Sequence, residues 1–323
     1  MKKITIYLMT LLAATAVTVT AQTRTDSLEQ GARRYVARNF SEVRTFNLYW
    51  ETTPSQDYTL QQNGKEIENG KIRDVNTLKF STTIPVVLLK NFSLYANGHF
   101  NSYQFETISN VNETGSAIFS KNEEGYKYYE GTVTGTYRTK IGSKPLILIA
   151  TGSGDGWNKG LEKVQGIFSA VMIFKRSATT SFSAGLCGMT LYETAPVLPI
   201  INYWHQFNQN LSIDVILPSR AYLRYQYNNN QRLSIGASLE SDHFYMESGL
   251  KDLPKVSFFN KISIKPELVY EYIINHHFYL SARGGAAALI KGGLYNTNRR
   301  GQNVKFTQPM TPFFNLGFSY NLF

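Results

Sequence analysis

The chain has 323 residues, a formal net charge of +10 and a single cysteine, Cys187. One cysteine cannot form an internal disulfide, so a disulfide-held scaffold is excluded. Aromatic residues make up 14% of the chain, with 21 tyrosines and 20 phenylalanines, while the mean hydropathy is only -0.25. This tyrosine content is typical of strands and of membrane interfaces, where the ring is buried and the hydroxyl stays hydrated.

The first residues have the pattern of a secretory signal peptide. Lys2 and Lys3 precede an apolar stretch from Ile4 to Val19, and Ala21 supplies a small residue at the expected cleavage position. We expect cleavage after Ala21, which makes residues 1–21 the signal peptide. A membrane-anchoring helix is the alternative, but the stretch is shorter than the ~18 residues that a spanning helix needs.

Residues 22–42 form a polar segment with weakly helical spacing. Asp26 or Ser27 could cap a helix, and Leu28, Tyr35 and Val36 recur at helical intervals. We expect either a short periplasmic helix or a plug that enters the domain that follows, over residues 43–323.

Apolar and polar residues alternate with a period of two through most of the remaining chain. In one segment Leu233, Ile235 and Leu239 share a face, and Ser234 and Glu240 share the other. A period of two predicts strands, whereas helices have a period of 3.6. We predict twelve strands at residues 43–51, 76–85, 91–106, 127–141, 145–154, 163–175, 180–191, 211–227, 231–246, 255–274, 278–290 and 311–323.

Several of these strands are longer than the about 5–6 residues usual in soluble proteins. They reach the about 9–11 residues with which a tilted strand crosses a bilayer. A soluble β-sandwich also alternates and is the alternative. The strand lengths, the signal peptide and the aromatic C-terminus together favour an all-β fold, a transmembrane antiparallel β-barrel.

The strand count depends on Pro218, which interrupts the segment 211–227. Apolar alternation continues across the proline, so we treat the segment as one kinked strand. If the segment breaks at Pro218, Pro199–Phe207 becomes another strand and the barrel has fourteen.

Short and long links alternate along the chain. Outer-membrane barrels have short periplasmic turns and longer outer loops, so both termini are expected to be periplasmic. Short links rich in turn-forming residues are expected at 142–145, 176–178, 228–230 and 275–277. Longer polar links are expected at 52–75, 108–126, 155–161, 192–210, 248–254 and 291–310.

The last strand, Phe313–Phe323, is amphipathic and ends on an aromatic residue. Phe314, Leu316 and Phe318 are expected to face lipid, as are Tyr320 and Leu322, because they share one parity. Asn315, Gly317, Ser319 and Asn321 are expected to face the lumen. Such a strand is similar to the signal that the outer-membrane barrel assembly machinery reads, although here the apolar positions have the opposite parity to Phe323.

Together with these features, "LPSRAYLRYQYN" at Leu217–Asn228 and "GFSYNLF" at Gly317–Phe323 resemble a family. The chain is similar to the uncharacterised outer-membrane β-barrel proteins of Bacteroidota, which are assigned to a domain of unknown function. The resemblance covers nearly the whole mature chain. It implies location in the outer membrane of a Gram-negative bacterium and a barrel fold, and it assigns no catalytic or binding residue.

By parity, the lumen face carries many charged side chains. In one interpretation they pair and plug the barrel, because buried charges must be compensated. In the other they line a narrow aqueous path that favours anionic solutes, because cations outnumber carboxylates. The residues expected to line the lumen are Lys79, Arg138, Lys140, Asp214, Arg224, Arg232, Glu240, Asp242, Lys261, Lys265, Glu267, Glu271 and Arg283.

The motifs for catalysis or metal binding are weak. Histidine is scarce, and no stretch has the serine and histidine spacing of a barrel lipase. His276 and His277 have no further ligands nearby in sequence, so we expect a polar turn and no metal site. "TGSGDGWNKG" at Thr151–Gly160 lacks the dinucleotide-binding spacing and predicts a tight outer loop. The dispersed basic charge does not suggest nucleic acid.

We therefore expect a porin-like, passive pore or transport-type barrel for small, anionic solutes, with no cofactor. Its partners are expected to be outer-membrane lipid and the assembly machinery, through residues 313–323. Two alternatives remain open at this point: a closed structural or adhesion barrel that works through its outer loops, and a membrane-embedded hydrolase.

Overall fold

The computed structural model describes residues 41, 44–111, 119, 125–189, 197–247, 255–275, 277–297 and 302–322. The signal peptide 1–21 and nearly all of the segment 22–42 lie outside the described residues, so the predictions for them stay predictions. Everything below concerns the compact unit Arg44–Leu322. None of the helical structure in the described residues is long and apolar enough to cross a membrane.

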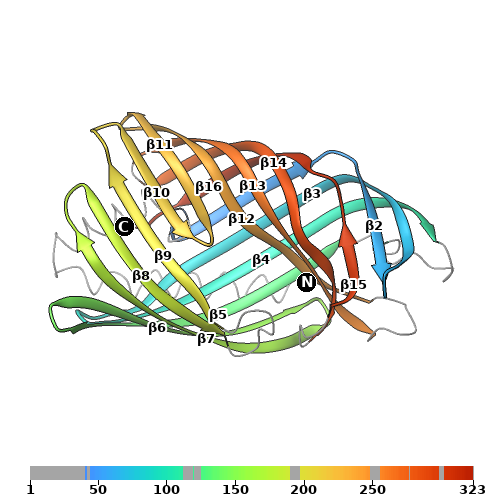
Figure 1. Cartoon of the computed structure of the whole chain (residues 1–323), viewed down its shortest axis with the longest axis horizontal. Helices are drawn as coiled ribbons and strands as arrows, with labels where there is room; N and C mark the ends of the chain where they lie inside the picture. The colour runs from blue at the N-terminus through green and yellow to red at the C-terminus, as the bar shows by residue number, and fades with distance from the viewer. Residues whose placement is uncertain are drawn as a thin grey trace, which may run out of the picture. The chain divides into compact units, whose positions relative to one another are not determined.

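The unit is built from antiparallel strands that follow one another around a closed ring (Figure 1). Consecutive strands pair from β3 to β14, and β1 closes the ring by pairing with both β3 and β16. The strands are β1 (Phe46–Thr53), β2 (Gln56–Gln62), β3 (Lys65–Leu88), β4 (Phe92–Val111), β5 (Tyr126–Ile141), β6 (Lys144–Trp157), β7 (Gly160–Arg176), β8 (Thr180–Met189), β9 (Val197–Gln206), β10 (Leu211–Leu217), β11 (Arg220–Asn228), β12 (Gln231–Glu247), β13 (Val256–Ile274), β14 (Phe278–Asn296), β15 (Gln302–Thr307) and β16 (Thr311–Tyr320).

The ring has fourteen positions, because two pairs of consecutive short strands each fill one position. β1 and β2 both pair with β3, along its two halves. β15 and β16 pair in the same way with β14. The breaks fall at Pro54 and Pro309, where the ladder loses an N–H donor. The prediction of an antiparallel barrel is confirmed.

The prediction of twelve strands is wrong, and the alternative of fourteen is confirmed. The segment 211–227 is a hairpin of β10 and β11, with Ile216 opposite Arg220. A proline in the middle of a strand would leave a gap in the ladder, and the chain turns at Pro218 instead. β9, which was expected to belong to a loop over 192–210, pairs with β8 and β10.

Two further links that we expected to be loops, 52–75 and 291–310, contain β2 and β15. These strands pair with each other, with Leu60 opposite Phe306. The turn between β2 and β3 is formed by Asn63 and Gly64, whose φ angles are 51° and 78°. Asn-Gly is a strong hairpin signal, because both residues tolerate positive φ. The residues around this turn are mostly polar, so β2 and the start of β3 do not show the apolar alternation from which we predicted strands.

The barrel wall differs in height around the ring. β3 has 24 residues, and β4 has 20, whereas β10 has 7 and β11 has 9. In Figure 1, β2 and β15 lie at the right-hand end of the barrel, and the short β10 and β11 lie at the left. The tall wall therefore extends beyond the short wall at one end.

An apolar belt covers the outer surface of the barrel. On β16, Phe314 and Leu316 are 44% and 46% exposed, whereas Asn315 between them is 1% exposed. The predicted alternation of the last strand is confirmed as far as Leu322. Large exposed apolar side chains recur on the other strands, and this continuous apolar surface is the one that a bilayer covers in a transmembrane β-barrel.

Candidate functional site

The interior of the barrel contains an ion pair that joins two strands which are not neighbours in the ring. Lys79 on β3 places its Nζ 2.7 Å from Asp242 Oδ1 and 3.4 Å from Glu240 Oε2, both on β12. β3 and β12 are not neighbours in the ring, because β1, β16, β14 and β13 separate them. The contact must therefore cross the lumen.

Further charged side chains surround this pair. Lys265 Nζ on β13 lies 2.6 Å from Glu51 Oε1 on β1 and 2.9 Å from Glu240 Oε2. Arg283 on β14 lies 2.9 Å from Glu240 Oε1 and 2.7 Å from Glu267 Oε1. Glu240 thus contacts three cations. We name the charge layer, which also includes a 3.5 Å contact from Lys261 to Asp242, by its residues: Glu51, Lys79, Glu240, Asp242, Lys261, Lys265, Glu267 and Arg283.

The charge layer holds as many cations as carboxylates, so its formal charge is balanced. It is partly desolvated, because Lys265 is 2% exposed whereas the side chains of Lys79 and Glu240 are 20% and 21% exposed. A buried ion pair is stable only when its geometry and its further hydrogen bonds compensate for the lost hydration. Ser238 Oγ, which donates to Glu267 Oε1 at 2.8 Å, and Asn315 provide such hydrogen bonds.

A second group of charges extends from Arg44, at the end of the barrel where β1 begins, to Arg220, beside the turn between β10 and β11. Arg44 NH2 lies 2.8 Å from Glu271 Oε1, and Arg232 contacts the other oxygen of the same carboxylate. Arg224 NH2 lies 2.5 Å from Asp214 Oδ2, and Arg220 Nε lies 3.3 Å from it. We name this the arginine layer: Arg44, Asp214, Arg220, Arg224, Arg232 and Glu271. It has four cations and two carboxylates.

Apolar and aromatic side chains fill the interior on the other side of the charge layer. The rings of Tyr126 and Phe244 stack at 4.3 Å between centroids, and Phe244 stacks on Phe259 at 4.8 Å. These rings come from β5, β12 and β13. We name the aromatic plug by its buried residues: Tyr58, Leu60, Ile72, Tyr103, Phe119, Tyr126, Phe244, Met246, Phe259, Leu294, Val304 and Phe306.

The plug forms because the end of β12 leaves the barrel wall. β11 pairs with β12 only as far as Ser238, but β12 continues to Glu247. Leu239 is 36% exposed, whereas Tyr245, on the same face of the strand, is fully buried. The Tyr245 hydroxyl donates to Asp155 Oδ1 on β6 at 2.5 Å. β6 is not a neighbour of β12 in the ring, so this end of β12 lies inside it.

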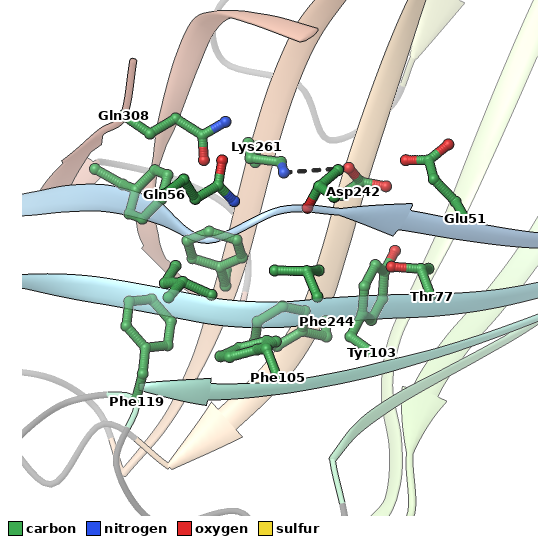
Figure 2. Close-up of a pocket in the computed structure, with 15 residues that line it drawn as sticks. Glu51, Gln56, Thr77, Tyr103, Phe105, Phe119, Asp242, Phe244, Lys261 and Gln308 are labelled. Carbon is green, nitrogen blue, oxygen red and sulfur yellow. Dashed lines mark ion pairs between the residues drawn. The ribbon is translucent and has the colours of Figure 1, made fainter. Parts of the chain in front are cut away.

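A pocket lies between the charge layer and the aromatic plug. Its volume is about 50 Å³, which is room for a few water molecules. Figure 2 shows Gln56, Gln308 and Lys261 on one side of it, and Phe105 and Phe119 on the other. The pocket therefore has one polar and one aromatic wall.

Most residues expected to line the lumen belong to the two layers. Arg138 and Lys140 do not, because both are exposed near the end of β5. Glu51, Arg44 and Arg220 also belong to the layers but were not among the predicted residues. Glu51 shares the polar face of its strand, which is a signal that could have found it. Those that belong to the layers are Lys79, Asp214, Arg224, Arg232, Glu240, Asp242, Lys261, Lys265, Glu267, Glu271 and Arg283.

The aromatic plug was not predicted either, although the face of β12 carries a signal. Glu240 and Asp242 are followed on the same face by Phe244 and Met246, so this face changes from charged to apolar. Among the described residues, no three histidine, cysteine or acidic side chains converge on a position that could hold a metal ion.

Comparison with known proteins gives a family match and remote structural likenesses. Residues 161–321 match the model of a domain of unknown function, DUF6268. No curated protein is similar to the chain in sequence.

Three solved structures are outer-membrane barrels similar to the chain. An outer membrane channel from Pseudomonas putida F1 has 10% identity and a TM-score of 0.40, covering 86% of this chain and 95% of its own. The outer membrane protease OmpT from Escherichia coli has 10% identity and a TM-score of 0.32, covering 85% and 96%. A FadL homologue from Pseudomonas aeruginosa has 7% identity and a TM-score of 0.31, covering 87% and 91%. These likenesses are too remote to transfer any activity.

Proposed function

We propose that the protein is a transport-type barrel of the outer membrane, which passes small solutes and is held closed at rest by contacts across its lumen. Fourteen strands support this proposal, because about 8 strands enclose a lumen that side chains fill, whereas 16–18 leave an aqueous channel. A fourteen-stranded ring is wide enough for a path and needs additional contacts to close it.

The observation that carries the proposal is the contact of Lys79 with Asp242 and Glu240 across the lumen. It is made by single side chains of two strands that are not neighbours in the ring. The carboxylates keep other cations if Lys79 moves away, because Asp242 also contacts Lys261 and Glu240 also contacts Lys265 and Arg283. Lys79 can therefore move away without leaving a carboxylate unpaired, as a reversible closure requires.

We propose that the solutes are anionic. The balanced charge layer gives no preference, whereas the arginine layer places four arginines and two carboxylates, counted among the described residues, along the same lumen. A pore wall with an excess of one sign raises the local concentration of the opposite ion.

Flux into proteoliposomes tests the function. The variant Lys79→Met should admit small solutes faster than the wild type does, and anions faster than cations of equal size. The matched control is Lys71→Met, on the same strand, because Lys71 is exposed and pairs with Asp57 near the surface. Equal flux through wild type and Lys79→Met, with both barrels inserted, would favour the closed structural barrel.

We also propose that the chain is not a hydrolase. Ser241 Oγ lies 3.3 Å from His243 Nδ1, but it donates to Asn260 Oδ1 at the shorter distance of 2.7 Å. A serine nucleophile must donate its only proton to the base. Ester hydrolysis by the wild type that Ser241→Ala abolishes would contradict this proposal.

Location and assembly are proposals of the same kind. Cell fractionation should find the chain in the outer membrane. Insertion should depend on the strand 313–323, which is our proposed contact with the assembly machinery. Replacing Phe318, which is 42% exposed, with Asp should leave the chain in the periplasm.

A further inference from the structure

Six exposed cations lie along one arc of the barrel, at the end where β1 begins and β16 ends. Lys90 lies in the link between β3 and β4, and Lys144 opens β6. Arg138 and Lys140 lie at the end of β5, and Lys175 and Arg176 at the end of β7. We name these six residues the basic rim.

The basic rim has no acidic residues around it. The segments 80–101, 131–154 and 164–191 contain no aspartate and no glutamate. Within the described part of the chain, no member of the rim forms an ion pair. Arg138 donates to Ser93 Oγ at 3.0 Å, and Lys144 donates to the Phe174 carbonyl oxygen at 3.2 Å. These neutral acceptors leave the positive charges uncompensated.

The described residues of the other links at this end include no lysine or arginine. The links 207–210 and 229–230 consist of Phe207 and of asparagine and glutamine, and the described residues of the link 275–277 are Asn275 and His277. A charge that served only solubility would be spread around the ring. The basic rim is confined to the arc from β3 to β8, so it indicates a directed contact.

The basic rim is continuous in space. β3 to β8 are consecutive neighbours in the ring. The Arg138 N–H donates to the Asn91 carbonyl oxygen at 2.7 Å, which places the end of β5 beside the link that holds Lys90. The bond from Lys144 to Phe174 places the start of β6 beside the end of β7.

Exposed apolar side chains lie next to two of these cations in the sequence. Leu89 precedes Lys90 and is 59% exposed, and Ile141 follows Lys140 and is 58% exposed. These residues continue the apolar belt, so the basic rim lies at the boundary between the hydrocarbon and the polar headgroups. Lysine and arginine at this boundary extend their charged ends toward the headgroups.

We propose that the basic rim binds anionic phospholipid headgroups of the adjacent leaflet. The headgroup phosphates supply the missing negative charge, and Leu89 and Ile141, beside Lys90 and Lys140, contact the acyl chains. The preceding segment 22–43 is a poorer counter-charge, because it has four arginines and only three carboxylates. The proposal requires the transmembrane fold and is independent of transport.

Competitive lipid binding tests the proposal. The purified barrel in detergent is mixed with equal amounts of phosphatidylglycerol and phosphatidylcholine, and native mass spectrometry measures the ratio of the two bound lipids. The rim variant combines Lys90→Gln, Lys144→Gln and Lys175→Gln. The control combines Lys65→Gln, Lys71→Gln and Lys255→Gln, which remove the same charge from exposed positions at the opposite ends of their strands.

The wild type and the control should retain phosphatidylglycerol preferentially. The rim variant should lose this preference by about tenfold or more, because each surface cation contributes measurably to anionic lipid binding. Added salt should reduce the preference of the wild type. An unchanged ratio in the rim variant, or an equal loss in the control, would overturn the proposal. If the triple variant fails to fold, Lys144→Gln alone should show a smaller loss.

Discussion

The charge layer and the aromatic plug fill the same lumen by different physical means. In the charge layer, the attraction between Lys79 and Asp242 offsets the free energy of hydration that both side chains lose. The free energy of this contact is therefore sensitive to water and salt. In the aromatic plug, Phe244 and Phe259 gain from burial and from close ring contacts. The comparison indicates that the charge layer is the part of the closure that water can reverse, and that the plug keeps the end of β12 inside the barrel.

The largest effect is expected from Glu240→Gln. This substitution leaves Lys79, Lys265 and Arg283 without the carboxylate that they share. Breaking a buried ion pair by removing one partner costs about 3–5 kcal/mol. Urea titration followed by gel mobility measures the free energy of unfolding, and an unchanged midpoint would show that the charge layer is hydrated.

Phe244→Ala should destabilise the barrel by roughly 3 kcal/mol, because it removes a fully buried ring from the centre of the plug. The loss should be the same in low and in high salt. In contrast, the loss in Glu240→Gln should depend on salt. A salt-dependent loss in Phe244→Ala would remove the distinction between the two layers.

Tyr245→Phe should have a smaller effect, about 1–2 kcal/mol, because it removes only the hydroxyl that donates to Asp155. This bond joins β12 to β6. Hydrogen exchange of the amides in residues 239–247 should become faster in this variant. Unchanged exchange would show that ring packing alone holds the end of β12.

Lys71→Met is expected to have the smallest effect, within about 1 kcal/mol, because exposed ion pairs contribute little. Lys71 Nζ lies 3.7 Å from Asp57 Oδ1, and both side chains are exposed. Urea titration beside the Glu240→Gln variant measures the difference. A loss as large as that of Glu240→Gln would show that position within the lumen does not matter.

The sequence predicted the elements whose faces differ in polarity. β12, β13 and β16 have one apolar and one polar face, and a period of two is visible in each. β2 and β15 escaped prediction because they extend beyond the apolar belt, so their outer faces are polar. For β10 and β11, the apolar parity happens to continue across Pro218, and only the proline marks the turn.

The charged residues of the lumen could be predicted by parity, but their partners could not. Lys79 and Asp242 come into contact because of the number of strands between them and the stagger of the strands in the ring. Neither of these two quantities can be read from the alternation within one strand. The aromatic plug depends on β12 leaving β11 beyond Ser238. Up to that residue the strand alternates in the ordinary way, and beyond it the change of one face from Glu240 and Asp242 to Phe244 and Met246 is the signal that the prediction missed.

The central claim is that the contacts of Lys79 across the lumen hold the reversible part of its closure. Single-channel conductance in a planar bilayer, compared between wild type and Lys79→Met, tests this claim most directly. The account predicts rare, brief openings of the wild type and more frequent, anion-selective openings of Lys79→Met, with Lys71→Met behaving as the wild type does. Steady conductance of the wild type, or the absence of conductance in Lys79→Met after verified insertion, would contradict it.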